Sequence, residues 1–464
     1  MERRFQVRLE DLRRDAQVPP GLLRGVAPRL DAFLRPFIAS LARDETRDNA
    51  GRYVRGLLSN LGAKTAEAIA YLHDRDRQGI QKFVGQGGWD HRPVVAELAR
   101  QVGAELGEPD GVLAFDPSAF AKKGDRSVGV ARQWCGRLGK LENCQVGVYL
   151  AYVSRRDHAL VDTRLYLPRE WTRRRKRMFK AGVPWGTRFR TRHELALEML
   201  DEHGPDLPHA WVSGDDEMGR SSWFRQQLRS RGERYLLAVP SNTSVRDLTA
   251  EVPYAGRGRR PKAPFVRADR WAAGLPARAW EAVEVRAAEK GPLVVQVARG
   301  PVQALAERRP ADAAEVLVAV RERQPDGSWK HDYLLSNAPP ETPAAAFARV
   351  LKAHHRVEEA LKRAKGEAGL ADYQVRTWCG WHHHQALSLV ATWFLTQEAR
   401  RGKKADPGPD GAAGEAGDWS GVAPAGRVRP ADPGAADDGA VAAADRGGKV
   451  LPLEAAEPLA TTTA

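Results

Sequence analysis

Three carboxylates occupy positions from which they could act together on a phosphodiester. Asp116 follows the apolar run 112–115, and Asp215 comes shortly after the apolar segment 210–212. Glu358 lies much later, in a stretch with helical periodicity. Carboxylates at strand ends are displayed at the edge of an open α/β sheet, where such sheets place their ligands. Together the three could hold two divalent ions, with Mg²⁺ as the expected metal because it prefers oxygen ligands.

The same pattern has an ordinary explanation. An aspartate at a strand end is often a turn residue or a helix cap, and 59 acidic residues offer many triples. Asp216 lies directly beside Asp215, so either aspartate could supply the second ligand. The residues around the carboxylates must decide between these interpretations.

The elements that would position the carboxylates follow from the hydrophobic pattern. Apolar residues at helical spacing fill the first hundred residues, and strand-like segments begin at Gly111. Alternating strands and helices then predict an α/β fold up to about residue 240. The predicted strands are 112–115, 145–153, 163–167, 210–212, 235–239, 283–286, 293–298, 316–321 and 333–335.

The last third of the chain changes character twice. Strands separated by turn signals between about 240 and 340 predict a β-rich insertion, and helical periodicity returns over 343–365 and 384–401. After Lys404 the composition is dominated by Gly, Ala, Pro and Asp, so we expect a disordered tail. The predicted boundaries are 1–108 for the helical N-terminal domain, 109–240 and 341–402 for the two parts of the α/β core, 241–340 for the insertion and 403–464 for the tail.

Composition narrows the class of partner and compartment. The 464 residues carry 73 Lys and Arg against 59 Asp and Glu, a formal charge of +14, which favours a polyanionic partner. The three cysteines form no CxxC pair, which indicates a reducing, cytoplasmic environment and argues against a cysteine-built zinc site. We find no signal peptide, membrane-span pattern, Walker loop or dinucleotide fingerprint, and expect no membrane partner and no nucleotide cofactor.

Basic residues are concentrated in two stretches. RRRKR at 173–177, followed by Lys180, Arg188, Arg190 and Arg192, is the densest, and YAGRGRRPK at 254–262 is the second. Such clusters usually form a solvated face, but beside a nuclease-like site they can bind phosphates. The predicted DNA contacts are Lys122, Lys123, Arg132, Gln133, Arg173, Arg174 and Arg175. His382, His383 and His384 cannot all serve one metal ion, because neighbouring residues on a helix point in different directions.

The residues around the carboxylates carry a family resemblance. They read LAFDPSAFAKKG at 113–124, WVSGD at 211–215, SNAP at 336–339, and RVEEA at 356–360 followed by YQVR at 373–376. These blocks, in this order, resemble the DDE-type transposases of bacterial insertion sequences, in particular the insertion sequence 701 group. The resemblance covers roughly residues 45 to 402.

The resemblance implies a fold, a site and an activity. It implies an RNase H-like catalytic core interrupted by the β-rich insertion, with Asp116, Asp215 and Glu358 as catalytic residues and as ligands of two Mg²⁺ ions, for which Mn²⁺ could substitute. Its N-terminal region would bind the ends of the element. The implied enzyme cleaves the terminal inverted repeats and transfers the 3′ ends into target DNA, working as a homodimer on DNA. Lys365, two helical turns after Glu358, and Arg376 would contact DNA.

Two departures from the family pattern leave alternatives open. His354 and His355 stand where family members often carry an Arg and a Trp, and the atypical tail replaces further apolar helices. The atypical tail leaves open an inactive DNA-binding descendant that acts as a regulator. A stand-alone DNA endonuclease, which would have the same site and differ only in its products, is the other alternative.

Overall fold

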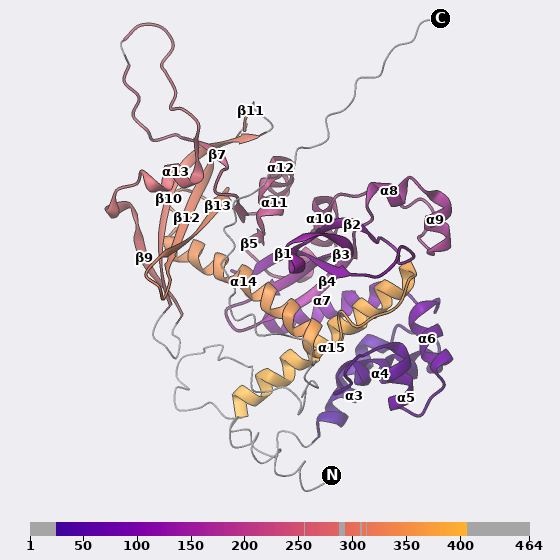
Figure 1. The fold of residues 1–464 in the computed structure, drawn as a ribbon. Helices are drawn as coiled ribbons and strands as arrows, with labels where there is room; N and C mark the ends of the chain where they lie inside the picture. The colour runs from indigo at the N-terminus through magenta and orange to yellow at the C-terminus, as the bar shows by residue number, and fades with distance from the viewer. Residues whose placement is uncertain (1–24, 255, 287–292, 307–308, 312, 406–464) are drawn as a thin grey trace, which may run out of the picture. The chain divides into compact units, whose positions relative to one another are not determined.

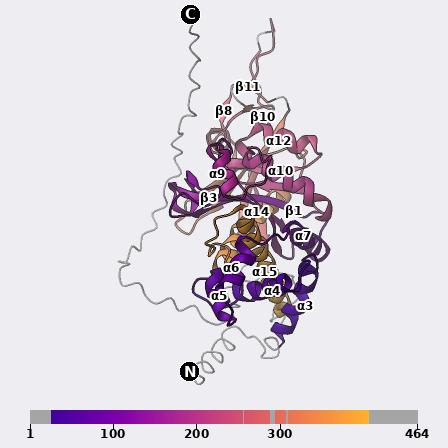
Figure 2. The same ribbon diagram turned by 90° about the vertical axis from the view of Figure 1, so that its right-hand side faces the viewer.

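The computed structural model describes residues 25–254, 256–286, 293–306, 309–311 and 313–405. Residues 1–24 of the predicted N-terminal domain and most of the predicted disordered tail lie outside these ranges. Residues 403–405, which the sequence assigned to that tail, end a long helix. Figures 1 and 2 give two views of the chain.

The N-terminal region is helical, as predicted. Its helices are α3 Val26–Ile38, α4 Asp44–Leu57, α5 Ala66–Leu72, α6 Arg77–Gly85 and α7 Arg92–Leu106. α4, α6 and α7 pack against the C-terminal helix α15, Trp378–Ala405, whereas α5 packs against α4 and α6. Tyr53 Oη of α4 lies 2.8 Å from His384 Nδ1 of α15, and His383 bonds the carbonyl oxygens of Val84 and Trp89. His383 and His384 thus find hydrogen-bond partners on distant segments of the chain, and these helices share one hydrophobic core with the sheet.

Nearly all the strands join one mixed sheet. They are β1 Val112–Ala121, β2 Ala131–Cys135, β3 Lys140–Val153, β4 His158–Leu165, β5 Trp211–Gly214, β6 Tyr235–Val239, β7 Ser244–Asp247, β8 Val266–Arg267, β9 Glu281–Arg286, β10 Leu293–Ala306, β11 Arg309–Pro310, β12 Glu315–Arg323 and β13 Trp329–Ser336. The order along the sheet is β2-β3-β1-β5-β6-β13-β12-β10-β7-β8. In addition, β4 pairs with β3, and β9 and β11 pair with β10.

Strand direction divides this sheet into two parts. β1, β5 and β6 run parallel, and β3 lies antiparallel to β1. From β13 onward the strands pair antiparallel, starting with β13 against β6. The α/β prediction is therefore confirmed, and so is the β-rich character of the segment after residue 240. The short strands β2, β7, β8 and β11 were not predicted.

Helices cover the sheet around β1 and β3. Between β4 and β5 come α8 Arg169–Thr172, α9 Arg175–Lys180 and α10 Arg192–His203, and after β5 come α11 Asp216–Arg220 and α12 Ser222–Ser230. α13 Ala268–Ala273 lies in the β-rich segment, and α14 Ala344–Glu367 follows it. α10 begins with a capping box of Thr191 and Glu194.

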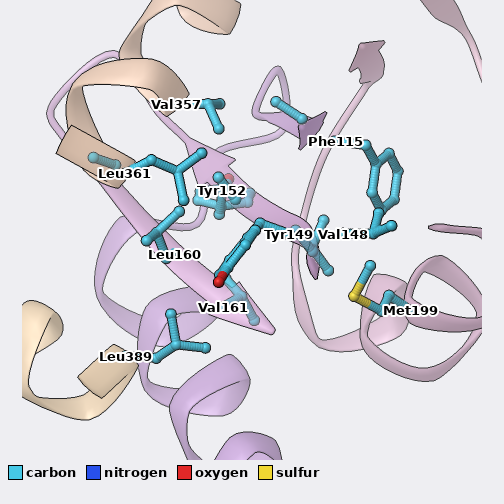
Figure 3. Close-up of a cluster of buried hydrophobic side chains, with 14 of the residues drawn as sticks. Phe115, Val148, Tyr149, Tyr152, Leu160, Val161, Met199, Val357, Leu361 and Leu389 are labelled. Carbon is cyan, nitrogen blue, oxygen red and sulfur yellow. The ribbon is translucent and has the colours of Figure 1, made fainter. Parts of the chain in front are cut away.

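Alternation along the strands builds a core on both faces. Phe115 and Val148 point toward Met199 of α10, whereas Leu160 lies toward Leu361 of α14 and Leu389 of α15 (Figure 3). This is the side-chain period of two that a sheet between helices requires. The carboxylate-bearing strand is therefore held rigidly from both sides.

Candidate active site

Asp116 and Asp215 come from neighbouring parallel strands at the same level. β1 and β5 pair from Val112 opposite Trp211 to Phe115 opposite Gly214, so each aspartate is the next residue after the last pair. The sequence placed Asp116 at a strand end, and this is wrong in one respect. β1 continues to Ala121, because its other edge stays paired with β3, where Asp116 faces Tyr149. Asp116 lies at the end of the parallel pairing and in the middle of the strand.

The surroundings of Asp116 disfavour its ionised form. The pKa of Asp116 is raised to about 8, first by burial and then by the negative charges of Asp215 and Glu358. The Lys365 ammonium opposes this rise. A buried carboxyl beside like charges holds its proton more tightly, because both effects raise the energy of the anion.

Asp215 caps the helix that follows its strand. Its carboxylate accepts a 3.1 Å hydrogen bond from the Met218 backbone N–H at the start of α11. Burial, followed by the charge of Glu217, raises the pKa of Asp215 to about 7, while the bond from Met218 lowers it. Asp216 points elsewhere: it is exposed and pairs with Arg220 at 2.6 Å. Of the two adjacent aspartates, Asp215 is the one with electrostatic influence on Asp116.

Two contacts align α14 with β1 and thereby place Glu358. Arg349 donates a 2.8 Å hydrogen bond to the Asp110 carbonyl oxygen just before β1, and Lys365 donates one of 2.7 Å to Ser118 Oγ near its end. The helix rises about 24 Å between these two anchors, close to the ~26 Å that extended chain covers from Asp110 to Ser118. Glu358, between the anchors, therefore lies along the middle of β1. Its side chain is exposed, and its charge reaches Asp116.

A fourth carboxylate, Glu217, belongs to the same neighbourhood and was not predicted. Its charge raises the pKa of both Asp116 and Asp215. Arg192 of α10 holds it through a 2.5 Å ion pair, and the Arg192 guanidinium also lies 4.9 Å from the Tyr166 ring. The Asp-Asp-Glu run at 215–217 was visible in the sequence, but only the turn into α11 shows which of its carboxylates face the site.

The carboxylate set fits a divalent cation by its chemistry. Carboxylate oxygens are the donors that Mg²⁺ prefers, and a cation would relieve the repulsion that raises the pKa of Asp116 and Asp215. Within the described ranges, however, no three His, Cys, Asp or Glu side chains stand close enough together to hold one ion. Asp215 and Glu358 are thus each within electrostatic range of Asp116, without a closed ligand shell in the described part of the chain.

The predicted DNA-contacting residues next to Asp116 fall into two groups. Lys123, Arg132 and Arg376 are exposed. Lys122 is partly buried: its ammonium lies 3.4 Å from the centre of the Tyr373 ring, and burial lowers its pKa to about 8. Gln133 donates to the Cys144 carbonyl oxygen at 2.9 Å. The loop after β1 and the segment bearing Arg376 are joined, since the Val128 N–H donates to the Arg376 carbonyl oxygen.

The two basic stretches lie on different parts of the sheet. Arg173, Arg174 and Arg175 are exposed at α8 and α9, which follow β4 on the β3 side. The second stretch belongs to the loop between β7 and β8, and the structure describes its residues 254 and 256–262. Figure 1 shows this loop extending from the other end of the sheet. The basic surface is therefore split between the two sides of the carboxylates.

A mixed sheet that presents carboxylates from two parallel strands and a packed helix is a suitable framework for metal-dependent phosphodiester chemistry. Comparison with known families agrees, because residues 36–292 match the DDE superfamily endonucleases, and the chain belongs to this family. The matched residues include Asp116 and Asp215 and end before Glu358. No helix in the described part of the chain has the length and apolar character to cross a membrane.

A curated relative sharpens this assignment. The chain is 29% identical over 215 residues to a protein of Microchaete diplosiphon named "Probable transposase for insertion sequence element IS701". The match covers 44% of this chain and 52% of the relative, so the chain spans about half the length of that protein. The resemblance to DDE-type transposases of the insertion sequence 701 group is confirmed.

Proposed function

We propose that this protein is a DNA transposase that cleaves the ends of its insertion element and transfers the freed 3′ ends into target DNA. The observation that carries the proposal is the register that brings Asp116 and Asp215 side by side on parallel strands, under the helix bearing Glu358. The family match and the similarity to the curated transposase support it. DNA with terminal inverted repeats and target DNA are the proposed partners, and a homodimer on DNA is the proposed assembly, since two ends must be cut together.

We propose an RNase H-like core for this site. The order β4-β3-β1-β5-β6, with β3 antiparallel and β1, β5 and β6 parallel, supports it. The strands after β6 then form an insertion, which ends where β13 returns to pair with β6 before α14 begins. In this arrangement the insertion separates the second aspartate from the glutamate along the chain, and the packing of α14 along β1 supports bringing Glu358 back to Asp116.

Each residue of the proposed site has a distinct task. Asp116, Asp215 and Glu358 would hold two Mg²⁺ ions, which when bound activate the attacking oxygen and neutralise charge on the leaving oxygen. Asp215 is oriented by the Met218 N–H at its helix cap. Lys365 lowers the pKa of Asp116 and so favours the ionised, ligand-competent carboxylate. Lys123, Arg132 and Arg376 are exposed and free to bind backbone phosphates, which positions DNA without reading its sequence.

The test uses the purified chain, a labelled DNA fragment with the ends of its element and a target plasmid, with Mg²⁺ or EDTA. Metal-dependent joined product is expected, with a loss of about a thousandfold in Asp116→Asn. Two matched pairs assign the ligands: Asp215→Asn and Glu358→Gln should be inactive, whereas their exposed neighbours, Asp216→Asn and Glu359→Gln, should retain activity. Cleavage without joining would indicate a stand-alone endonuclease, and binding without cleavage a regulator.

A further inference from the structure

Two large aromatic rings stand out from the surface beside the basic residues of α8 and α9. Phe179 at the end of α9 is 80% exposed, and Trp185 in the following turn is 85% exposed, the two highest values among the large hydrophobic residues of the described chain. We call these two residues the aromatic pair. The mechanism above uses neither, and apolar rings of this size gain nothing from contact with water.

The backbone that carries the aromatic pair is anchored to the core. Met178, Ala181 and Val183, which lie between or beside the two rings in sequence, are buried. The Ala181 carbonyl oxygen accepts a 2.8 Å hydrogen bond from the Trp378 N–H at the start of α15. The rings are therefore held outward on a fixed support.

The turn that presents Trp185 is well defined. The Thr187 N–H donates to the Pro184 carbonyl oxygen at 3.2 Å, which closes a four-residue turn with Trp185 at its tip. Gly186 has φ +85°, the left-handed value that this position of a type II turn requires and that glycine adopts without strain. The indole is thus displayed by a turn whose sequence suits that geometry.

The charge around the aromatic pair selects the partner. Arg173, Arg174, Arg175, Lys176 and Lys180 are all exposed, and none of them forms an ion pair within the described part of the chain. The Arg175 guanidinium lies 5.5 Å from the centre of the Trp185 ring. A second copy of this surface would bring like charges together, whereas nucleic acid offers phosphates for the cations and base faces for the rings.

We propose that Phe179 and Trp185 form a stacking site for an unpaired nucleobase of the bound DNA, with the neighbouring cations on its flanking phosphates. In intact duplex DNA the base faces are covered by their neighbours, so the site takes a base that is unstacked at a strand end, a bulge or a distorted step. The inference rests on the proposed function. It adds that this surface recognises DNA in which a base is unpaired and unstacked.

The test compares two fluorescein-labelled duplexes of one arbitrary sequence, identical except for one unpaired thymidine in the second. Binding is measured by anisotropy with the full chain at several salt concentrations. The wild-type chain should prefer the bulged duplex by about tenfold, since stacking on an aromatic ring strengthens binding by that order. Phe179→Ala and Trp185→Ala should each lose most of the preference yet bind the intact duplex as before, and Trp185→Phe should keep it.

Two control variants separate stacking from charge and from general aromatic exposure. Arg174→Ala should weaken binding to both duplexes equally. It should also reduce the slope of log K against log salt concentration by about the amount of one phosphate contact. Trp223→Ala removes a tryptophan of α12 that is 42% exposed and distant in sequence from the basic cluster, and it should leave the preference unchanged. Thermal unfolding of Trp185→Ala should match the wild type, because the ring makes little contact with the core.

Other outcomes are distinguishable. Equal wild-type affinity for both duplexes, or a preference that survives in Phe179→Ala and Trp185→Ala, would overturn the stacking site and leave the transposase proposal intact. A wild-type dimer that dissociates in these variants with no change in DNA binding would make the surface a protein interface and also overturn it. A wild-type chain that binds neither duplex would contradict the transposase proposal itself.

Discussion

Lys365 Nζ of α14 donates a 2.7 Å hydrogen bond to Ser118 Oγ, and Ser118 lies two residues after Asp116 on β1. The Lys365 charge lowers the pKa of Asp116 against the combined effect of burial and the neighbouring carboxylates. The sequence predicted a DNA contact for this lysine, and the structure gives it a second task at the carboxylate itself. These two tasks lead to different experimental signatures.

Lys365→Ala should slow DNA cleavage by about ten- to a hundredfold, because a hydrogen bond from a charged group contributes roughly 1.5–3 kcal/mol. It should also move the acid limb of the pH–rate profile to higher pH, since the pKa of Asp116 rises when its cation is removed. Lys365→Arg should restore much of the rate. Single-turnover cleavage across pH measures both effects. A slower reaction with an unmoved pH profile would leave the phosphate contact as the only task of Lys365.

The raised pKa of Asp116 predicts that metal-free protein loses stability as pH increases. Its folded pKa of about 8 lies above the ordinary value of 3.8, so the folded state binds more protons than the unfolded state between about pH 4 and pH 8. The contribution of Asp116 to the free energy of unfolding must fall through this window, and Asp215, with a pKa of about 7, adds to this fall. Asp116→Asn, which cannot ionise, should be more stable than the wild type at pH 8 by a few kcal/mol and similar to it near pH 4.

Denaturant unfolding in EDTA at several pH values checks this prediction, and the difference between the two proteins is the quantity to follow. Buried histidines act in the opposite direction, because burial lowers the pKa of His354 to about 4 and so favours folding as pH rises from about 4 to 6.5. That contribution is common to wild type and Asp116→Asn and cancels in the difference. Parallel stability curves for the two proteins would contradict the raised pKa.

Metal binding should be measurable as stabilisation at the same site. A cation that binds only the folded state stabilises it by RT ln(1 + [Mg²⁺]/Kd), so millimolar Mg²⁺ should raise the Tm of the wild type at pH 8 by several degrees. Asp116→Asn should lose most of this shift in Tm. Asp216→Asn should keep it, because the wild-type Asp216 carboxylate pairs with Arg220 and not with the metal. The experiment needs no DNA and therefore tests the ligands apart from catalysis. An equal shift in all three proteins would place the metal elsewhere.

The sequence predicted the two aspartates of the candidate site, but not the extent of the strand that carries the first of them. Asp116 and Asp215 were singled out because each comes shortly after a short apolar run, and the family resemblance of the surrounding residues supported the choice. That β1 continues through Asp116 depends on its pairing with β3, which starts far along the chain at Lys140, and Pro117 obscures the strand signal. Glu217 was missed for a related reason. The direction of the Glu217 side chain is set by the helix cap in which Asp215 accepts from the Met218 N–H. The identities of the neighbouring residues alone do not reveal this turn.

The longer strands after residue 240, β9, β10, β12 and β13, were predicted individually, but the side-chain contacts that connect them to the candidate active site were not. Arg225 of α12 and Glu315 of β12 form a buried ion pair of 2.8 Å, far apart in sequence, and Tyr235 Oη of β6 also donates to Glu315 at 2.6 Å. Arg225 additionally bonds the Gly219 carbonyl oxygen at the end of α11, the helix capped by Asp215. The pair thus links the β-rich segment to the helix at the active site.

Breaking this ion pair should destabilise the protein strongly. Arg225→Met leaves Glu315 buried without its cation, which costs about 3–5 kcal/mol in comparable sites. Glu315→Gln keeps an acceptor for Tyr235 and should cost less. The double variant Arg225→Met with Glu315→Gln removes both charges and should recover part of the loss, because no unpaired charge remains. Urea unfolding of the four proteins measures the coupling, and strictly additive losses would mean that the two side chains contribute independently despite their contact.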